Sequence, residues 1–185
     1  MGSLFLAFQT TGQDLFLAGL NNSHSGNLSV RQDARVLITR RGAMLGRLKE
    51  ADLIETGLSE NDANTEMAST ELDVHRAIYQ NSAAQAIVHA HPVHAIALSL
   101  TEDTITPVDA EGRFYFASIP ILRPNNAIAS PEVAAKLPPL LKEHKIVVIA
   151  GHGSFATGQN LEEAYHWTSA LENACKIICL ARSLR

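Results

Sequence analysis

The chain has 185 residues, of which 46% are hydrophobic and 18% are charged, and its formal net charge at pH 7 is −4. This length suits one hydrophobic core, so residues 1–185 are predicted to form a single domain. A mildly acidic chain with scattered basic residues is atypical of nucleic-acid-binding proteins. No apolar run reaches the roughly 18 residues that a membrane span needs, so we expect neither a membrane nor a nucleic-acid partner.

The only cysteines are Cys175 and Cys179, which lie four residues apart in a helical pattern. This spacing forms neither a CxxC motif nor a disulfide framework. We interpret both as core residues of a protein in a reducing cytoplasm. Residues 1–20 contain an apolar patch but lack the basic region of a secretion signal, which also favours a cytoplasmic protein.

The first half of the chain predicts a helix, a hairpin and a second helix. Apolar residues recur at helical spacing over 3–20, which predicts an amphipathic helix. Residues 28–42 contain two short β-rich runs on either side of Gln32 and Asp33, which predicts a β-hairpin. A helix is predicted to begin near Ser69, with a serine or threonine cap and an acid in its first turn.

The second half mixes predicted strands and helices without a regular alternation. Its elements are a strand within 86–94, a strand-and-turn region over 107–124, a helix over 130–144 that Pro138 and Pro139 could break, a strand over 145–151, and a long helix capped by Asn160. This order predicts an α+β or layered αβα domain.

The segment AIVHAHPVH, residues 86–94, places three histidines in an apolar run. Side chains two residues apart in a strand point to the same face, so His89 and His91 are expected to lie side by side. Pro92 should end the strand, and His94 is not expected to join the pair. From this spacing alone, metal ligation and ordinary paired or surface imidazoles both remain open.

A third histidine, His152, lies between two glycines directly after an apolar strand. Glycine allows close backbone approach, so His152 is expected at the mouth of a site, although an ordinary loop residue is the alternative. Together with His89 and His91 it would complete three nitrogen donors. This is the ligand set of catalytic zinc sites that keep a fourth position open.

Three further segments carry groups that donate hydrogen bonds to an anion: HSGN at 24–27, TRRG at 39–42, and Ser69 with Thr70. Backbone N–H groups near glycines, hydroxyls and a helix N-terminus can together hold a phosphate. Ordinary turn and cap chemistry is the alternative for each segment alone. Glu71 follows the third segment, where an acid also stabilises a helix start.

In this order and at about these separations, HSGNLSVR, ITRRG, STELDVHRAIY, VHAHPVHA and GHGSFATGQNLEEAYHWTSALE resemble the class II aldolase/adducin family over roughly residues 4–181. The resemblance implies one three-layer αβα domain around a mainly antiparallel sheet, assembled as a homotetramer. It also implies a metal, Zn²⁺ or another divalent ion, on His89, His91 and His152. Glu71 is then the catalytic acid/base, and a substrate phosphate lies among Gly26, Asn27, Thr39, Gly42, Ser69 and Thr70.

The resemblance implies a zinc-dependent aldolase, a lyase that cleaves a C–C bond of a phosphorylated sugar or related hydroxy-carbonyl compound through an enediolate stabilised by the metal. A sugar-phosphate epimerase or dehydratase on the same scaffold is the alternative. A non-enzymatic module like adducin is disfavoured, because the matched histidines and Glu71 are all present.

Two features depart from the family pattern. Arg40 and Arg41 stand where relatives commonly carry a proline and a small residue, so they either contact an additional acid of the substrate or face solvent. Ala110 lies near the position of a tyrosine that donates a proton in typical aldolases. Asp109 or Glu111 could replace that tyrosine.

Overall fold

The computed structural model describes residues 2–184 and contains an eight-stranded sheet. The strands are β1 (Asn27–Gln32), β2 (Arg35–Thr39), β3 (Leu53–Gly57), β4 (Ala86–Ala90), β5 (Thr104–Ile105), β6 (Ile119–Leu122), β7 (Ile146–Ile149) and β8 (Gly153–Gly158). Their order across the sheet is β3-β2-β1-β4-β8-β7-β6-β5. Strands β6 and β7 pair in parallel and the other neighbours pair antiparallel, which confirms a mainly antiparallel sheet.

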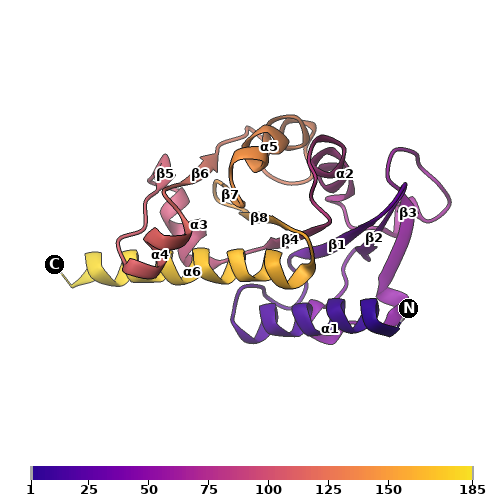
Figure 1. Ribbon diagram of the computed structural model, residues 1–185, viewed down its shortest axis with the longest axis horizontal. Coiled ribbons are helices and arrows are strands. Elements are labelled where there is room, and N and C mark those ends of the chain that lie inside the picture. Colours follow the sequence, from indigo (N-terminus) through magenta and orange to yellow (C-terminus); the bar gives the residue numbers. More distant parts are fainter. Residues whose placement is uncertain (1, 185) are drawn as a thin grey trace.

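Helices cover both faces of this sheet (Figure 1). They are α1 (Gly2–Leu17), α2 (Leu72–Asn81), α3 (Val93–Ser99), α4 (Ala110–Tyr115), α5 (Pro131–Glu143) and α6 (Leu161–Ser183), with short 3₁₀ helices at Leu45–Arg47, Glu50–Asp52 and Thr65–Met67. Helices α1 and α6 lie along one face, and α2 and α5 lie along the other. The predicted three-layer αβα architecture is therefore confirmed.

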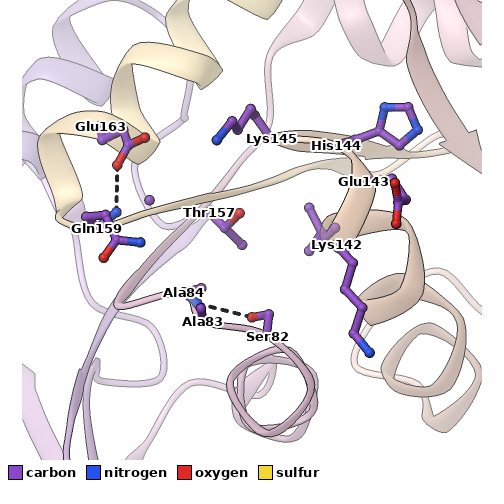
Figure 2. A pocket seen from close by; sticks show the side chains of 12 residues that line it. Ser82, Ala83, Ala84, Lys142, Glu143, His144, Lys145, Thr157, Gln159 and Glu163 are labelled. Carbon is purple, nitrogen blue, oxygen red and sulfur yellow. Dashed lines mark hydrogen bonds between the residues drawn. The ribbon is translucent and has the colours of Figure 1, made fainter.

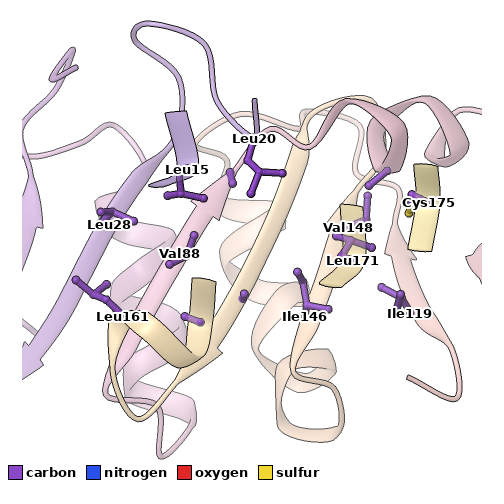
Figure 3. Close-up of a cluster of buried hydrophobic side chains, with 14 of the residues drawn as sticks. Leu15, Leu20, Leu28, Val88, Ile119, Ile146, Val148, Leu161, Leu171 and Cys175 are labelled. Carbon is purple, nitrogen blue, oxygen red and sulfur yellow. The ribbon is translucent and has the colours of Figure 1, made fainter. Parts of the chain in front are cut away.

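Each face of the sheet buries its own hydrophobic cluster. Leu28 and Val88 belong to the cluster beneath α1 and α6, and Figure 3 shows them with Leu171 from α6. Ile87 belongs to the cluster beneath α2 and α5. Because side chains alternate along a strand, His89 shares the α2/α5 face with Ile87. The alternation of β4 thus brings a polar side chain into the layer that also holds α2.

Several elements agree with the sequence, whereas β3, α3 and β8 were not predicted and others differ. The long helices α1 and α6 and the β1–β2 hairpin are confirmed, and Asn160 caps α6 by accepting a hydrogen bond from the Glu163 N–H (N···O 2.8 Å). The region 107–124 was predicted as strand and turn, and it contains the strand β6 but also the helix α4. Its N-cap Asp109 accepts a hydrogen bond from the Gly112 N–H (N···O 2.8 Å), which stabilises this short helix start.

The predicted helix over 130–144 is present as α5, and it continues through Pro138 and Pro139, which could have broken it. Each proline removes an N–H donor. Val133, Leu137 and Leu141 recur at i, i+4 and are all buried in the core, so tertiary packing outweighs the local penalty. No helix within residues 2–184 combines the length and the apolar character that crossing a membrane requires.

Candidate metal centre and active site

Three imidazoles converge where β4 ends and β8 begins. One ring nitrogen from each of His89, His91 and His152 lies within 4.8 Å of the others. The Nε2 atoms of His89 and His91 are 3.1 Å apart, and the ring centroids of the three pairs are 4.8 to 5.0 Å apart. Because β4 and β8 are antiparallel neighbours, the end of β4 lies beside the turn that carries His152. The structure thus brings together the three histidines that the sequence singled out.

Two glycines allow His152 to approach β4. Gly151 adopts φ +68°, in the left-handed region that favours glycine, and its N–H donates to Ser99 Oγ (N···O 2.9 Å). A Cβ at Gly153 would collide with the Ala90 carbonyl oxygen and approach the His91 ring to 2.9 Å. Glycine at both positions is therefore a steric requirement of the histidine cluster.

Neighbouring groups fix the orientation of His89. Its Nδ1 lies 3.0 Å from the Ser154 carbonyl oxygen, which can only accept, so Nδ1 carries the proton and Nε2 presents a lone pair. The His89 ring also stacks on Phe155, with centroids 4.2 Å apart and an angle of 18° between the planes. A ligand histidine held through its second nitrogen is typical of metal sites.

The protein holds these imidazoles neutral. Burial lowers the pKa of His89 well below its ordinary value, with the His91 and His152 charges acting in the same direction. Burial also lowers the pKa of His91 to about 4 and lowers the pKa of His152. Deprotonated imidazole nitrogens are the form that binds a metal, so this donor set fits a divalent ion with an open coordination position.

A carboxylate lies beside this cluster. Glu71 Oε1 is 4.0 Å from His152 Nε2 and accepts a hydrogen bond from the Ala129 N–H (N···O 3.0 Å). The other oxygen, Oε2, is buried and has no hydrogen-bond partner among the described residues. Burial raises the pKa of the Glu71 carboxyl, and the Ala129 N–H partly offsets this effect. A buried acid beside three imidazoles is a candidate for proton transfer.

The helix α2 begins later than predicted, and this changes the position of Glu71 relative to the helix. The helix begins at Leu72 and not near Ser69, and Glu71 takes the N-cap position without a side-chain cap bond. Ser69 Oγ accepts a hydrogen bond from the Glu71 N–H (N···O 3.2 Å). The Glu71 side chain is therefore part of the buried site. It is not an exposed acid that merely stabilises the start of the helix.

The three predicted phosphate segments meet next to the histidines. Asn27 is the cross-strand partner of His89, and Thr39 Oγ1 accepts a hydrogen bond from the Leu28 N–H (N···O 3.2 Å). The Ser69 N–H donates to the Thr39 carbonyl (N···O 3.1 Å). These contacts link the segments in a continuous path from His89. The Asn27 Oδ1 atom is buried and has no partner among residues 2–184.

Glycines shape the first two turns. Gly26 adopts φ +76°, and a Cβ there would lie 2.6 Å from the His89 carbonyl oxygen. Gly42 also has a positive φ, +71°, and lies at the surface with Thr70. Arg40 and Arg41 are exposed as well.

Other candidates have structural roles elsewhere. His94 Nδ1 lies 2.7 Å from Glu172 Oε1 in a separate pair, so His94 stays outside the cluster as predicted. The side chain of Asp109 caps α4, which makes it a poor replacement for the expected tyrosine. Glu111 lines a cavity with His166 between α4 and α6.

Sequence reasoning missed Ala129 and Ser154, because both act through main-chain atoms. Such contacts leave no signal in residue type.

A cavity larger than the one beside Glu111 lies at the end of β8 that is opposite His152 (Figure 2). It has a volume of about 400 Å³, and Thr157 and Lys142 line it. Its wall includes Gly158, the last residue of β8, whereas His152 precedes the first. This cavity is therefore separate from the histidine cluster and from Glu71.

The family model "Class II Aldolase and Adducin N-terminal domain" matches residues 7–179. A 3-oxo-tetronate 4-phosphate decarboxylase of Haemophilus influenzae is 33% identical over 177 residues, covering 90% of this chain and 82% of that protein. A methylthioribulose-1-phosphate dehydratase of Acidiphilium cryptum is 31% identical over 175 residues, covering 87% and 82%. The crystal structure of L-fuculose-1-phosphate aldolase from Thermus thermophilus has TM-score 0.95 and 37% identity, covering 100% and 96%. The chain therefore belongs to the class II aldolase and adducin N-terminal domain family, and it is an enzyme of the class II aldolase type.

Proposed function

We propose that this chain is a zinc-dependent lyase that cleaves a C–C bond of a phosphorylated sugar or related hydroxy-carbonyl compound. One observation carries the proposal: three neutral histidine nitrogens lie within 4.8 Å of one another beside the buried carboxylate of Glu71. The similarity to L-fuculose-1-phosphate aldolase of Thermus thermophilus supports the same reaction type.

His89, His91 and His152 would hold the metal through their ring nitrogens. Three neutral nitrogen ligands suit zinc better than magnesium or calcium, which prefer oxygen ligands, and they leave a position for substrate. When bound, such an ion supplies a Lewis acid that stabilises negative charge on substrate oxygens. The hydrogen bond from His89 Nδ1 to the Ser154 carbonyl keeps Nε2 available for this role.

Glu71 would move the proton. Its pKa is raised by burial, which brings a carboxyl group closer to the pH at which a general acid/base works best. Oε1 is held by the Ala129 N–H, whereas Oε2 has no partner among the described residues. We assign proton exchange to Oε2.

The turns around Asn27, Thr39 and Ser69 would bind the substrate phosphate. Hydrogen bonds from the Leu28 N–H to the Thr39 hydroxyl and from the Ser69 N–H to the Thr39 carbonyl link them, and the path begins at the strand partner of His89. Main-chain N–H groups and hydroxyls bind an anion without a net positive charge, in keeping with the chain's charge of −4. Gly26, Gly42 and Thr70 complete this proposed subsite.

A dehydratase or decarboxylase is the second candidate, because relatives with these two names match this chain at 31% and 33% identity. An epimerase also uses the same proton chemistry. These reactions differ in the residue that accepts or donates a second proton. Glu71 is common to all of them and does not distinguish one from another.

The proposal includes a homotetramer of this chain in the cytoplasm. Light scattering should then give about four times the chain mass of 20.0 kDa.

Product analysis tests the proposed reaction. The zinc-loaded protein is incubated separately with L-fuculose 1-phosphate, methylthioribulose 1-phosphate and 3-oxo-tetronate 4-phosphate. An aldehyde product from the first substrate supports the aldolase. Loss of water from the second or release of CO₂ from the third, with no aldehyde from the first, supports the second candidate. No turnover of any of the three contradicts both assignments.

A further inference from the structure

The loop 123–130, which joins β6 to α5, contributes a hydrogen bond to the candidate active site. The Ala129 N–H donates to Glu71 Oε1 (N···O 3.0 Å), and the same oxygen lies 4.0 Å from His152 Nε2. Glu71 Oε2 is buried and has no partner among residues 2–184. The loop therefore distinguishes the two oxygens of one carboxylate.

Ala129 adopts a conformation that alanine rarely takes. Its φ is +47°, in the left-handed region where a Cβ crowds the backbone. Asp33, the other non-glycine residue with a positive φ in the described part of the chain, lies in the β1–β2 hairpin turn, where aspartate commonly adopts it. Ala129 lies in a bend of the loop 123–130, directly before the N-cap of α5. Strained backbone of this kind is typical of functional sites.

The residues around Ala129 hold this conformation from both sides. On one side, Ser130 Oγ accepts a hydrogen bond from the Val133 N–H (N···O 3.1 Å) and donates one to the Asn126 carbonyl (O···O 2.7 Å). On the other side, the Ile128 N–H donates to Asn126 Oδ1 (N···O 3.2 Å). The cap of α5 thus fixes the loop, and the Ala129 N–H is directed at Glu71.

We infer that Ala129 is a positioning residue whose N–H holds Glu71 Oε1 and leaves Oε2 to exchange protons with the substrate. The inference rests on the proposed role of Glu71. An N–H···carboxylate bond is directional and stronger than a bond between neutral groups. Without it, the terminal torsion of Glu71, which has only a broad intrinsic preference, is no longer held in one orientation by a hydrogen bond. The fraction of molecules with Oε2 correctly placed then falls.

A backbone ester tests this role without changing a side chain. Lactic acid in place of Ala129 replaces the N–H by an oxygen. We expect kcat to fall at least tenfold, with KM and zinc content each within twofold of wild type. The matched control is lactic acid in place of Ala117, an exposed alanine between α4 and β6 whose N–H donates no hydrogen bond to Glu71 or to the loop 123–130. The control should keep kcat within twofold of wild type. A wild-type kcat for the Ala129 ester, or an equal loss for both esters, overturns the inference.

A double-mutant cycle separates positioning from a general loss of structure. In a Glu71→Gln background, the Ala129 ester should change single-turnover rates less than twofold, because its partner is no longer the proton-transfer group. A further tenfold loss in that background would show that the loop acts independently of Glu71 and overturns the inference.

A spectroscopic experiment decides the underlying contact without any substrate. The Ala129 amide is followed by NMR in ¹⁵N-alanine-labelled protein. In wild type we expect a downfield proton shift and slow exchange with solvent. Glu71→Ala should move the resonance upfield and speed exchange at least tenfold. An unchanged shift and exchange rate overturn the inference. If the amide responds but no substrate is turned over, the proposed function fails and the contact stands.

Discussion

Asn27 and His89 face each other directly across the antiparallel pair of β1 and β4. Side chains of such partners lie on the same face of a sheet. Asn27 of the first proposed phosphate turn and His89, a proposed metal ligand, therefore lie on the face of the sheet that α2 covers. Glu71 at the start of α2 lies on the same face. This register brings the proposed anion subsite, the proposed metal ligands and the proposed acid/base together on the α2/α5 face.

The histidine cluster predicts that each wild-type chain binds about one divalent ion. His89→Ala should lose nearly all metal, because it removes the ligand held most firmly by Ser154 and Phe155. The measurement is elemental analysis after gel filtration. His94→Ala is the matched control, since His94 pairs with Glu172 outside the cluster and its loss should leave the metal content unchanged. Equal metal in wild type and His89→Ala would remove His89 from the site.

The buried carboxylate predicts a large catalytic effect with little structural change. Glu71→Gln keeps size and a hydrogen-bond acceptor but removes the basic oxygen. We expect kcat to fall by roughly two to four decades, with zinc content retained, because general acid–base catalysis supplies about that factor. Single-turnover kinetics and the melting temperature provide the measurement.

Asp73→Asn is the control for Glu71→Gln. Asp73 is an acid in the first turn of the same helix, but its side chain is 87% exposed and pairs with Arg76. This variant should keep wild-type turnover. Wild-type turnover in Glu71→Gln would assign the proton transfer to another residue.

The phosphate turns predict a selective loss of affinity. Asn27→Asp places a negative charge in the proposed anion subsite, so KM for a phosphorylated substrate should rise at least tenfold. The same substrate without its phosphate should show no comparable change. KM for both compounds is measured with the zinc-loaded variant. An equal rise for both compounds would argue that Asn27 acts on the fold and not on phosphate.

Several features of the site could be predicted from the sequence. The period of two in β4 correctly placed His89 on one face, and the proline after His91 correctly separated His94. The position of His152 required the order of motifs, because its closeness to His89 depends on the pairing of β4 with β8. Local patterns carry no information on such long-range pairing.

Other features could not be predicted, for identifiable physical reasons. Ser69 and Thr70 suggested a helix cap, yet the helix begins at Leu72 with Glu71 as its N-cap, and Ser69 Oγ accepts a hydrogen bond from the Glu71 N–H. The positive φ of Ala129 could not be predicted, because a sequence indicates a positive φ by glycine or asparagine and not by alanine. Asp109 could have been recognised as the cap of α4 from its carboxylate three residues before Gly112.

A final prediction concerns His75, a buried histidine of α2 outside the metal cluster. Its Nδ1 lies 2.6 Å from Ser29 Oγ, which in turn lies 2.7 Å from the Tyr79 hydroxyl. Burial lowers the pKa of His75 to about 3, far below its ordinary value of 6.5. The unfolded chain therefore binds a proton in a pH range in which the folded protein does not. The contribution of neutral His75 to stability is complete above pH 6.5 and decreases as the pH falls from 6.5 toward 3.

We expect the free energy of unfolding of the metal-free protein to decrease steeply between pH 6.5 and 4.5. His75→Gln should flatten this dependence, because the replacement does not titrate, although it should lower stability at pH 7. Urea unfolding of EDTA-treated protein at a series of pH values provides the measurement. His24→Gln, at an exposed position, is the control and should retain the wild-type slope. His89 and His91 also have lowered pKa values, so some pH dependence should persist in His75→Gln. A slope identical to wild type in His75→Gln would mean that His75 is protonated in the folded protein, or that its protonation does not oppose folding.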